Sequence, residues 1–105
     1  MRADTADVFA ALGDATRLAL IVRLGDGGPA SIVRLTEGSR MTRQAVTKHL
    51  AVLERAGLVR RARTGRESLW AIERDGLTAA QAWLDLMSRR WDDRLDALRA
   101  FVETE

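Results

Sequence analysis

Four polar side chains between residues 43 and 48 match the chemistry of DNA base edges. Arg43 can donate to guanine, Gln44 can pair with adenine, and Thr47 suits several bases or the thymine methyl group. Lys48 adds a cation that suits a phosphate. At about 100° per residue of an α-helix, the four side chains fall within one half of the helix surface. The spacing therefore predicts a helix face that reads bases.

The opposite side of the same helix, expected over residues 43–56, is apolar. Thr42 is the expected N-cap, and Arg40 precedes it. His49 falls near the middle of the apolar side, so we interpret it as a packed histidine that hydrogen-bonds a backbone carbonyl. The apolar members of this side are Ala45, Val46, Leu50, Val52, Leu53 and Ala56.

An ordinary amphipathic helix with a solvated polar face would show the same pattern, and the distribution of charge decides between the two interpretations. Residues 40–66 hold eight of the seventeen basic side chains and one acid, a net +7. The other 78 residues hold nine bases and fourteen acids, a net −5, so the chain total of +2 hides the contrast. A positive segment in an otherwise acidic chain favours contact with a polyanion.

The residue types argue against several other kinds of chemistry. The chain has no Cys and one His, so it lacks the side chains for a thiolate or imidazole metal site, and no cofactor is expected. It has no phosphate-binding loop and no GxSxG motif, so we do not expect an enzyme. No apolar run approaches the roughly 18 residues of a membrane span, and the polar segment 1–7 lacks a signal-peptide core. The absence of Cys suits a reducing cytoplasm.

The rest of the chain must position the basic segment, and residues 1–105 are expected to form one domain. The predicted order is that of a mainly α fold with a small β-hairpin, the winged helix-turn-helix. Helices are expected over residues 5–12, 15–25, 29–37, 43–56 and 77–102, and hairpin strands over 58–63 and 67–72.

Three details accompany these helices. Asp14 is the expected N-cap of the second helix. Pro29 is expected at the first position of the third. The inward-facing residues are expected to be Leu18, Ile21, Val22 and Gly25 in the second helix, and Ile32, Val33 and Leu35 in the third.

The expected hairpin, residues 58–72, would form the wing of such a fold. It turns at Thr64, Gly65 and Arg66. Arg63 and Arg66 lie at its tip, where an arginine can enter the minor groove of DNA. The alternative is that these arginines only keep the hairpin soluble.

The last helix carries an apolar stripe along most of its length and acids on its far side. At about 1.5 Å per residue it is near 40 Å long, more than four short helices can cover, so we expect a twofold dimer formed by the first and last helices. The alternatives are a monomer whose last helix folds over its own core and, for Trp83 and Trp91, the lining of a small apolar ligand pocket, although packing is favoured for both. The expected interface residues are Val8, Phe9 and Leu12 with Trp83, Leu84, Met87, Trp91, Leu95, Leu98 and Val102.

Two stretches resemble the ArsR/SmtB-type bacterial transcriptional regulators. Residues 9–18 (FAALGDATRL) resemble the opening of these proteins, and residues 42–59 (TRQAVTKHLAVLERAGLV) resemble their recognition helix and the entry to their wing. The turn at residues 64–66 and the long last helix are similar too. The resemblance implies a cytoplasmic homodimer that represses by occupying operator DNA, often its own, until an inducer weakens binding.

The resemblance also implies which residues contact double-stranded DNA. The recognition helix would enter the major groove and the wing would lie at the minor groove. By resemblance, the DNA-reading residues are Arg43, Gln44, Thr47 and Lys48, and the wing contacts are Arg63 and Arg66. Arg40 and Thr42, which precede the helix, are expected to bind DNA beside them.

One part of the family pattern is missing. Metal sensors of this family bind through cysteines on the third helix or through Asp and His on the last, yet residues 30–37 hold no Cys and the last helix holds no His. The chain resembles a subgroup without these ligands, and we do not expect it to respond to metals. The residues leave open whether a small-molecule inducer exists, and they do not identify the operator or the target genes. The alternative function is a winged-helix module that recruits a protein partner through its last helix.

Overall fold

A computed structural model describes residues 4–104; residues 1–3 of the polar N-terminal segment and residue 105 lie outside the described part. The two strands pair antiparallel in one sheet. The predicted winged helix-turn-helix order is confirmed. The elements are α1 (Thr5–Leu12), α2 (Ala15–Gly27), α3 (Ile32–Thr36), α4 (Arg43–Arg55), β1 (Val59–Thr64), β2 (Glu67–Ile72) and α5 (Arg74–Glu103).

Polar side chains fix where the helices begin. Asp14 accepts a hydrogen bond from the backbone N–H of Arg17 at 3.0 Å, and Thr42 accepts one from Ala45 at 3.1 Å. Each bond satisfies an N–H that the first turn of a helix leaves without a partner. α4 therefore begins where the sequence predicts, and it ends at Arg55, one residue before the predicted end.

The core lies where the first four helices meet the base of the hairpin. α4 contributes Val46, Leu50 and Leu53, each at most 1% exposed. Burying a side chain of this kind stabilises a fold by about 1.5–3 kcal/mol. The apolar face of α4 is thus held by the core, and its polar face is left at the surface. The other buried apolar residues include Val8, Ala11, Leu20, Leu24, Leu35, Ala56, Leu58, Val59 and Trp70.

The hairpin is fixed at both ends. Its register sets Arg61 opposite Trp70 and leaves Gly65 and Arg66 as a two-residue loop. Gly65 has a φ of +62°, which suits the first position of a type II′ turn. At the other end, Trp70 and Ala30 exchange two backbone hydrogen bonds of 2.8 and 2.9 Å. This bridge attaches the hairpin to the segment between α2 and α3.

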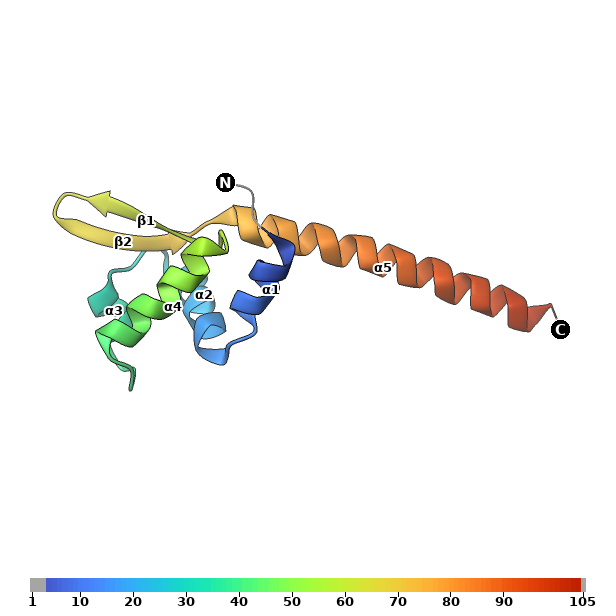
Figure 1. Ribbon diagram of the computed structural model, residues 1–105, viewed down its shortest axis with the longest axis horizontal. Coiled ribbons are helices and arrows are strands. Elements are labelled where there is room, and N and C mark those ends of the chain that lie inside the picture. The colour runs from blue at the N-terminus through green and yellow to red at the C-terminus, as the bar shows by residue number, and fades with distance from the viewer. Residues whose placement is uncertain (1–3, 105) are drawn as a thin grey trace.

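α5 projects from the body as one helix of 30 residues (Figure 1). Among its described residues only Gly76 and Ala80 are buried. The radius of gyration is 18.6 Å, whereas a compact domain of this length has one of about 13 Å. The elongation comes from α5, whose outer half extends beyond the other elements (Figure 1).

The predicted inner face of α2 is wrong except at Ile21, which is partly buried against the core, and Gly25 is exposed. The buried residues are Leu20 and Leu24, whereas Leu18 and Val22 are 48% and 54% exposed. α2 carries apolar residues on most of its sides, so periodicity alone does not select a face. Its contacts with α4 and β2 make the selection.

Two helix starts also differ from prediction. α3 does not begin at Pro29, because Ala30 pairs with Trp70 and Ser31 becomes the N-cap. Val33 is consequently exposed rather than inward. α5 begins at residue 74 instead of 77, with Glu73 as its N-cap.

Candidate nucleic-acid interface

The exposed face of α4 holds the four side chains that the sequence indicates for base reading. Arg43, Gln44, Thr47 and Lys48 are all exposed, and together they line one shallow hollow. The predicted two-sided helix is confirmed, since Val46 lies on the other side in the core. Donors and acceptors therefore stand side by side on an open surface, as contact with base edges requires.

The N-terminal end of α4 adds further polar groups. The hydroxyl of Thr47 donates to the carbonyl of Arg43 at 2.8 Å, which leaves its methyl group and a lone pair available to a base. The Thr42 oxygen accepts from Ala45, so the hydroxyl hydrogen of Thr42 remains available to a phosphate. Arg40 is exposed in the turn just before this cap. The dipole of α4 favours an anion at the same end.

The hairpin carries a second group of cations, and it lies with α4 at the end of the molecule away from the C-terminus (Figure 1). Arg63 and Arg66 are exposed at its tip, as expected, and Arg60 is exposed nearer its base. These cations and the polar face of α4 form the basic end of the molecule.

Sequence reasoning missed the place of Arg61. Its guanidinium lies over the ring of Trp70, 5.0 Å from the ring centroid. A guanidinium stacked on an aromatic ring still presents N–H groups at its edge. The two-residue loop sets the register that pairs Arg61 with Trp70, so the signal was present in the spacing of the hairpin.

Four acids lie at the opposite end of the molecule. The outer half of α5 extends away from α4 and from the hairpin (Figure 1). The outer half of α5 also holds four bases, Arg89, Arg90, Arg94 and Arg99, which balance its four acids, so it carries no net charge and the positive excess lies on α4 and the hairpin. The acids of this outer half are Asp92, Asp93, Asp96 and Glu103.

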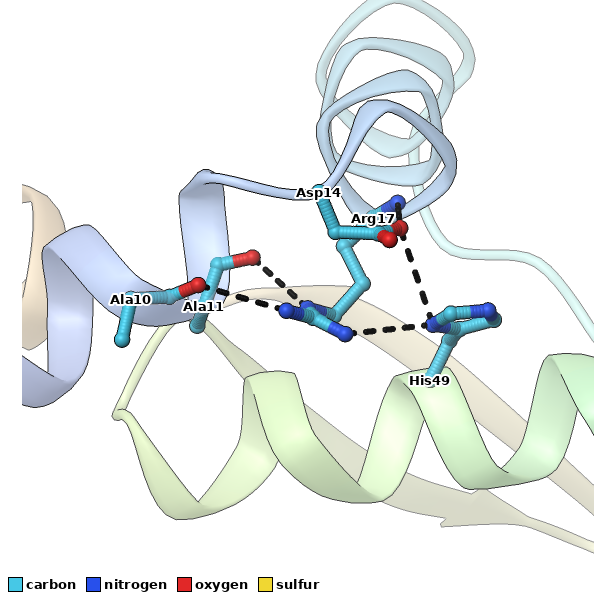
Figure 2. Close-up of polar contacts among 5 residues, drawn as sticks. All are labelled: Ala10, Ala11, Asp14, Arg17 and His49. Carbon is cyan, nitrogen blue, oxygen red and sulfur yellow. Dashed lines mark hydrogen bonds and ion pairs between the residues drawn. The ribbon is translucent and has the colours of Figure 1, made fainter.

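Behind the interface, Arg17 connects three helices (Figure 2). Its Nε donates to the carbonyl of Ala11 at 2.7 Å, and its Nη2 donates to the carbonyl of Ala10 at 3.2 Å. Its Nη1 lies 3.5 Å from Nδ1 of His49, and the same Nδ1 lies 3.9 Å from Oδ2 of Asp14. The end of α1, the start of α2 and the middle of α4 thus meet at one guanidinium.

This arrangement corrects the expectation for His49. The side chain of His49 is 25% exposed, and it faces the side chains of Arg17 and Asp14 rather than a backbone carbonyl. The hydrogen bond from the backbone N–H of Arg17 is the main cause that lowers the pKa of Asp14 from its ordinary value, and the positive charge of Arg17 acts in the same direction. Asp14 therefore stays ionised beside His49 at neutral pH.

The apolar stripe of α5 is exposed along most of its length. Phe9 and Leu12 of α1 lie partly buried beside the core. Val8 has no exposed surface, so it supports α1 from beneath and cannot line an interface between copies, contrary to expectation. Exposed apolar surface on this scale marks a contact with another molecule. The exposed members of the predicted set are Trp83, Leu84, Trp91, Leu95, Leu98 and Val102, between 43% and 66% exposed, and Met87 is half-buried.

Two observations concern other kinds of site. Over residues 4–104, no three His, Asp or Glu side chains come together in a group able to hold a metal ion. Among the helices described, none combines the length and the apolar character needed to cross a bilayer.

Comparison with known proteins gives a consistent result. A family described as a helix-turn-helix domain matches residues 12–62, from the end of α1 into β1. The HTH-type transcriptional regulator Rv2034 of Mycobacterium tuberculosis is 33% identical over 95 residues, which cover 90% of this chain and 85% of that protein.

Two solved structures are similar over almost their whole length. An ArsR-like transcriptional regulator from Rhodococcus sp. RHA1 is 34% identical with a TM-score of 0.83, and the match covers 92% of this chain and 91% of that one. An ArsR family transcriptional regulator, RHA00566, is also 34% identical with a TM-score of 0.74, over 88% of this chain and 97% of that one.

Proposed function

This chain belongs to the ArsR family of helix-turn-helix transcriptional regulators, and we propose that it acts as a homodimeric repressor of a specific operator. One observation carries the proposal. The polar face of α4 presents Arg43, Gln44, Thr47 and Lys48 on one open surface, beside an arginine-rich hairpin. A regulator that binds DNA through its helix-turn-helix needs such a surface at its recognition helix.

In the proposed complex α4 enters the major groove. Arg43 and Gln44 lie in its first turn, where a recognition helix meets base edges, and Thr47 follows one turn later. Lys48 and Arg40 are placed for phosphates, which position the protein without reading sequence. The hydroxyl of Thr42 donates to a further phosphate at the start of the helix.

The wing supplies a separate contact. Arg63 and Arg66 project from the hairpin tip, and the narrow minor groove of an A·T tract concentrates negative potential there. The bridge between Trp70 and Ala30 holds the base of the hairpin against the body, so the tip has a defined position. This contact adds affinity and favours narrow-groove sequences.

The dimer would form through α1 and α5. The exposed stripe of α5 includes Trp91, Leu95 and Leu98, each more than half exposed. A second copy related by a twofold axis would cover the same stripe on both chains and place the two α4 helices in successive major grooves, about 34 Å apart. The operator would accordingly contain two inverted half-sites.

The proposed repressor does not respond to transition metals. The chain has no Cys, and its one His lies beside Arg17 and Asp14. Neither a thiolate set nor a group of imidazoles is available for such an ion. Since it would act on the genome, we place the protein in the cytoplasm. We also propose that it controls its own gene. Release from the operator by a small-molecule inducer is compatible with this proposal.

The proposal is tested by footprinting the protein on the DNA upstream of its own gene, followed by titration of the protected duplex and of a shuffled duplex. We expect protection of one inverted repeat, and binding at least about 1,000-fold tighter than to the shuffled duplex. Equal affinity for the two duplexes would contradict specific binding, and a stable monomer in sedimentation at micromolar concentration would contradict the dimer.

The same titration addresses the alternative function, a module that recruits a protein through α5. Its motivation is the exposed stripe of that helix. Such a module would show no preference for the operator, and its complex would survive moderate salt. Operator binding that falls steeply with salt points to phosphate contacts and to the repressor.

A further inference from the structure

Arg17 belongs to α2, yet its side chain connects α1 with α4 (Figure 2). Two of its nitrogens donate to the carbonyls of Ala10 and Ala11, at 3.2 and 2.7 Å. The last carbonyls of a helix lack the usual partner within the helix, and these bonds supplement the one that the backbone N–H of Gly13 donates to Ala10 at 3.3 Å. The third nitrogen lies 3.5 Å from Nδ1 of His49 in α4. One guanidinium therefore holds the end of α1 and also touches the recognition helix.

The two helices joined in this way serve different parts of the proposed function. α1 packs against α5, where the ring of Phe9 contacts that of Trp83, and both helices belong to the proposed dimer contact. α4 carries the base-reading side chains. α1 and α4 also share apolar core contacts, but the hydrophobic effect has no directional preference. The hydrogen bonds of Arg17 are directional, so they fix the angle between α1 and α4.

We infer that Arg17 is a positioning residue that sets the separation of the two recognition helices in the dimer. If α4 rotated relative to α1, the twofold axis would repeat the rotation in the second copy. The displacements of the two α4 helices would then add and change the distance between them. An operator with two half-sites requires one distance between the two α4 helices. A single half-site contacts only one of these helices, so binding to it does not depend on that distance. The inference rests on the proposed dimer and on DNA binding by α4.

An Arg17 variant is expected to fold. The side chain is half-buried and lies outside the core, and α1 remains anchored by Val8 and Ala11, at most 2% exposed. The N-cap bond to Asp14 comes from the backbone N–H of residue 17, so it survives a change of side chain. Arg17→Met keeps an unbranched stem and removes every donor.

Arg23 provides a matched control on the same helix. Its guanidinium also donates to carbonyls of another helix, to Leu35 at 2.9 Å and to Arg34. These carbonyls belong to α3, so Arg23 does not touch α1 or the proposed dimer contact. Arg23→Met removes a bond set of the same kind with no effect on the relation between α1 and α4.

The experiment measures the binding of wild type, Arg17→Met, Arg17→Lys and Arg23→Met to two duplexes at low salt. One duplex is the operator found by footprinting, and the other retains one half-site in shuffled flanks. We expect Arg17→Met to bind the operator about tenfold more weakly, the effect of losing a charge-assisted hydrogen bond, and the half-site within about twofold of wild type. The operator affinity of Arg17→Lys should lie between those of wild type and Arg17→Met, because an ammonium group replaces only part of the guanidinium's set of N–H donors.

Two further readouts separate positioning from a general structural role. Operators with one base pair added or removed between the half-sites should rank differently for Arg17→Met than for wild type, while sedimentation shows the same dimer. Arg23→Met should change operator and half-site binding by equal factors. Equal losses on both duplexes by Arg17→Met, or no loss, would overturn the inference. Wild-type protein that does not prefer the operator would instead overturn the proposed function, and the inference with it.

Discussion

The ring of Phe9 in α1 meets the ring of Trp83 in α5 edge to face, with centroids 5.4 Å apart and planes at 67°. Aromatic pairs favour this geometry because the positive edge of one ring meets the negative face of the other. The contact joins the first and last helices near the base of α5. Trp83 is nevertheless 43% exposed, so the pair also stands at the edge of the apolar stripe that the helix presents to solvent.

The first prediction concerns that stripe. Leu98 lies at its centre and is 58% exposed, whereas Leu86 lies on another side of α5 and is 45% exposed. Leu98→Ser should weaken the dimer by about a hundredfold, because each copy loses about 1.5 kcal/mol or more of buried leucine. Leu86→Ser should leave association unchanged. Sedimentation equilibrium measures both, and equal behaviour of the two variants would argue against this interface.

The second prediction concerns the junction between α4 and α5. A Cβ atom added to Gly76 would lie 2.8 Å from the carbonyl oxygen of Ala56 and 2.9 Å from that of Gly57, both backbone atoms. Gly76→Ala should therefore lower the free energy of unfolding by about 1–3 kcal/mol, the usual cost of overpacking. In urea unfolding, the control Gly25→Ala should be stabilising by about 0.4–1 kcal/mol, since its added carbon has no neighbour within 4 Å.

The third prediction concerns acid stability. The backbone hydrogen bond from Arg17 lowers the pKa of Asp14 below its ordinary value of 3.8, so at low pH the unfolded chain takes up the proton first. The contribution of the Asp14 carboxylate to stability is complete above pH 3.8, and it is lost as the pH falls through the lower pKa of the folded state. The stability difference between wild type and Asp14→Asn should therefore shrink on going from pH 6 to pH 3.

Urea titrations at both pH values measure this difference. Asp26→Asn is the control, because Asp26 lies near the C-terminus of the same helix, where a carboxylate gains nothing from the helix dipole. A difference between wild type and Asp14→Asn that does not depend on pH would show that the charge of Asp14 is unimportant.

The fourth prediction separates base reading from phosphate contact. Arg43→Ala or Gln44→Ala should relax base preference at particular operator positions, by about 1–3 kcal/mol per position. Arg66→Ala should weaken binding more evenly across sequences than the two α4 substitutions do, and it should reduce the salt slope by about 1. Arg89→Ala on α5 removes the same charge far from α4 and should change neither quantity. Titrations over a set of operator variants and salt concentrations measure all four proteins.

The fifth prediction concerns the base of the wing. Arg61→Ala should lower the free energy of unfolding by about 0.5–1 kcal/mol, because the stacked contact with Trp70 is lost. Arg60→Ala removes a neighbouring charge from the other face of the same strand and should have no comparable effect. Thermal unfolding compares the two variants, and equal stabilities would mean that the Arg61 contact contributes nothing.

The sequence alone determined the elements whose pattern is local. α4 has one apolar and one polar side, so a period of 3.6 residues assigns Val46 to the core and Arg43 to the surface without reference to any neighbour. The hairpin was accessible too, because Gly65 marks a short turn, but the sequence predicted a turn of three residues, whereas Thr64 pairs with Glu67 and leaves a loop of two. Fold class and the base-reading face followed from these two segments.

Only the tertiary structure decided what depends on distant partners. α2 is apolar on most of its sides, and its neighbours, not its period, bury Leu20 in place of Leu18. α3 starts late because Ala30 pairs with Trp70, a contact between residues 40 positions apart in the sequence. Arg17 and His49 are separated by 32 positions and meet only when α2 packs on α4. No local pattern contains such contacts, because the packing of helices brings those side chains together.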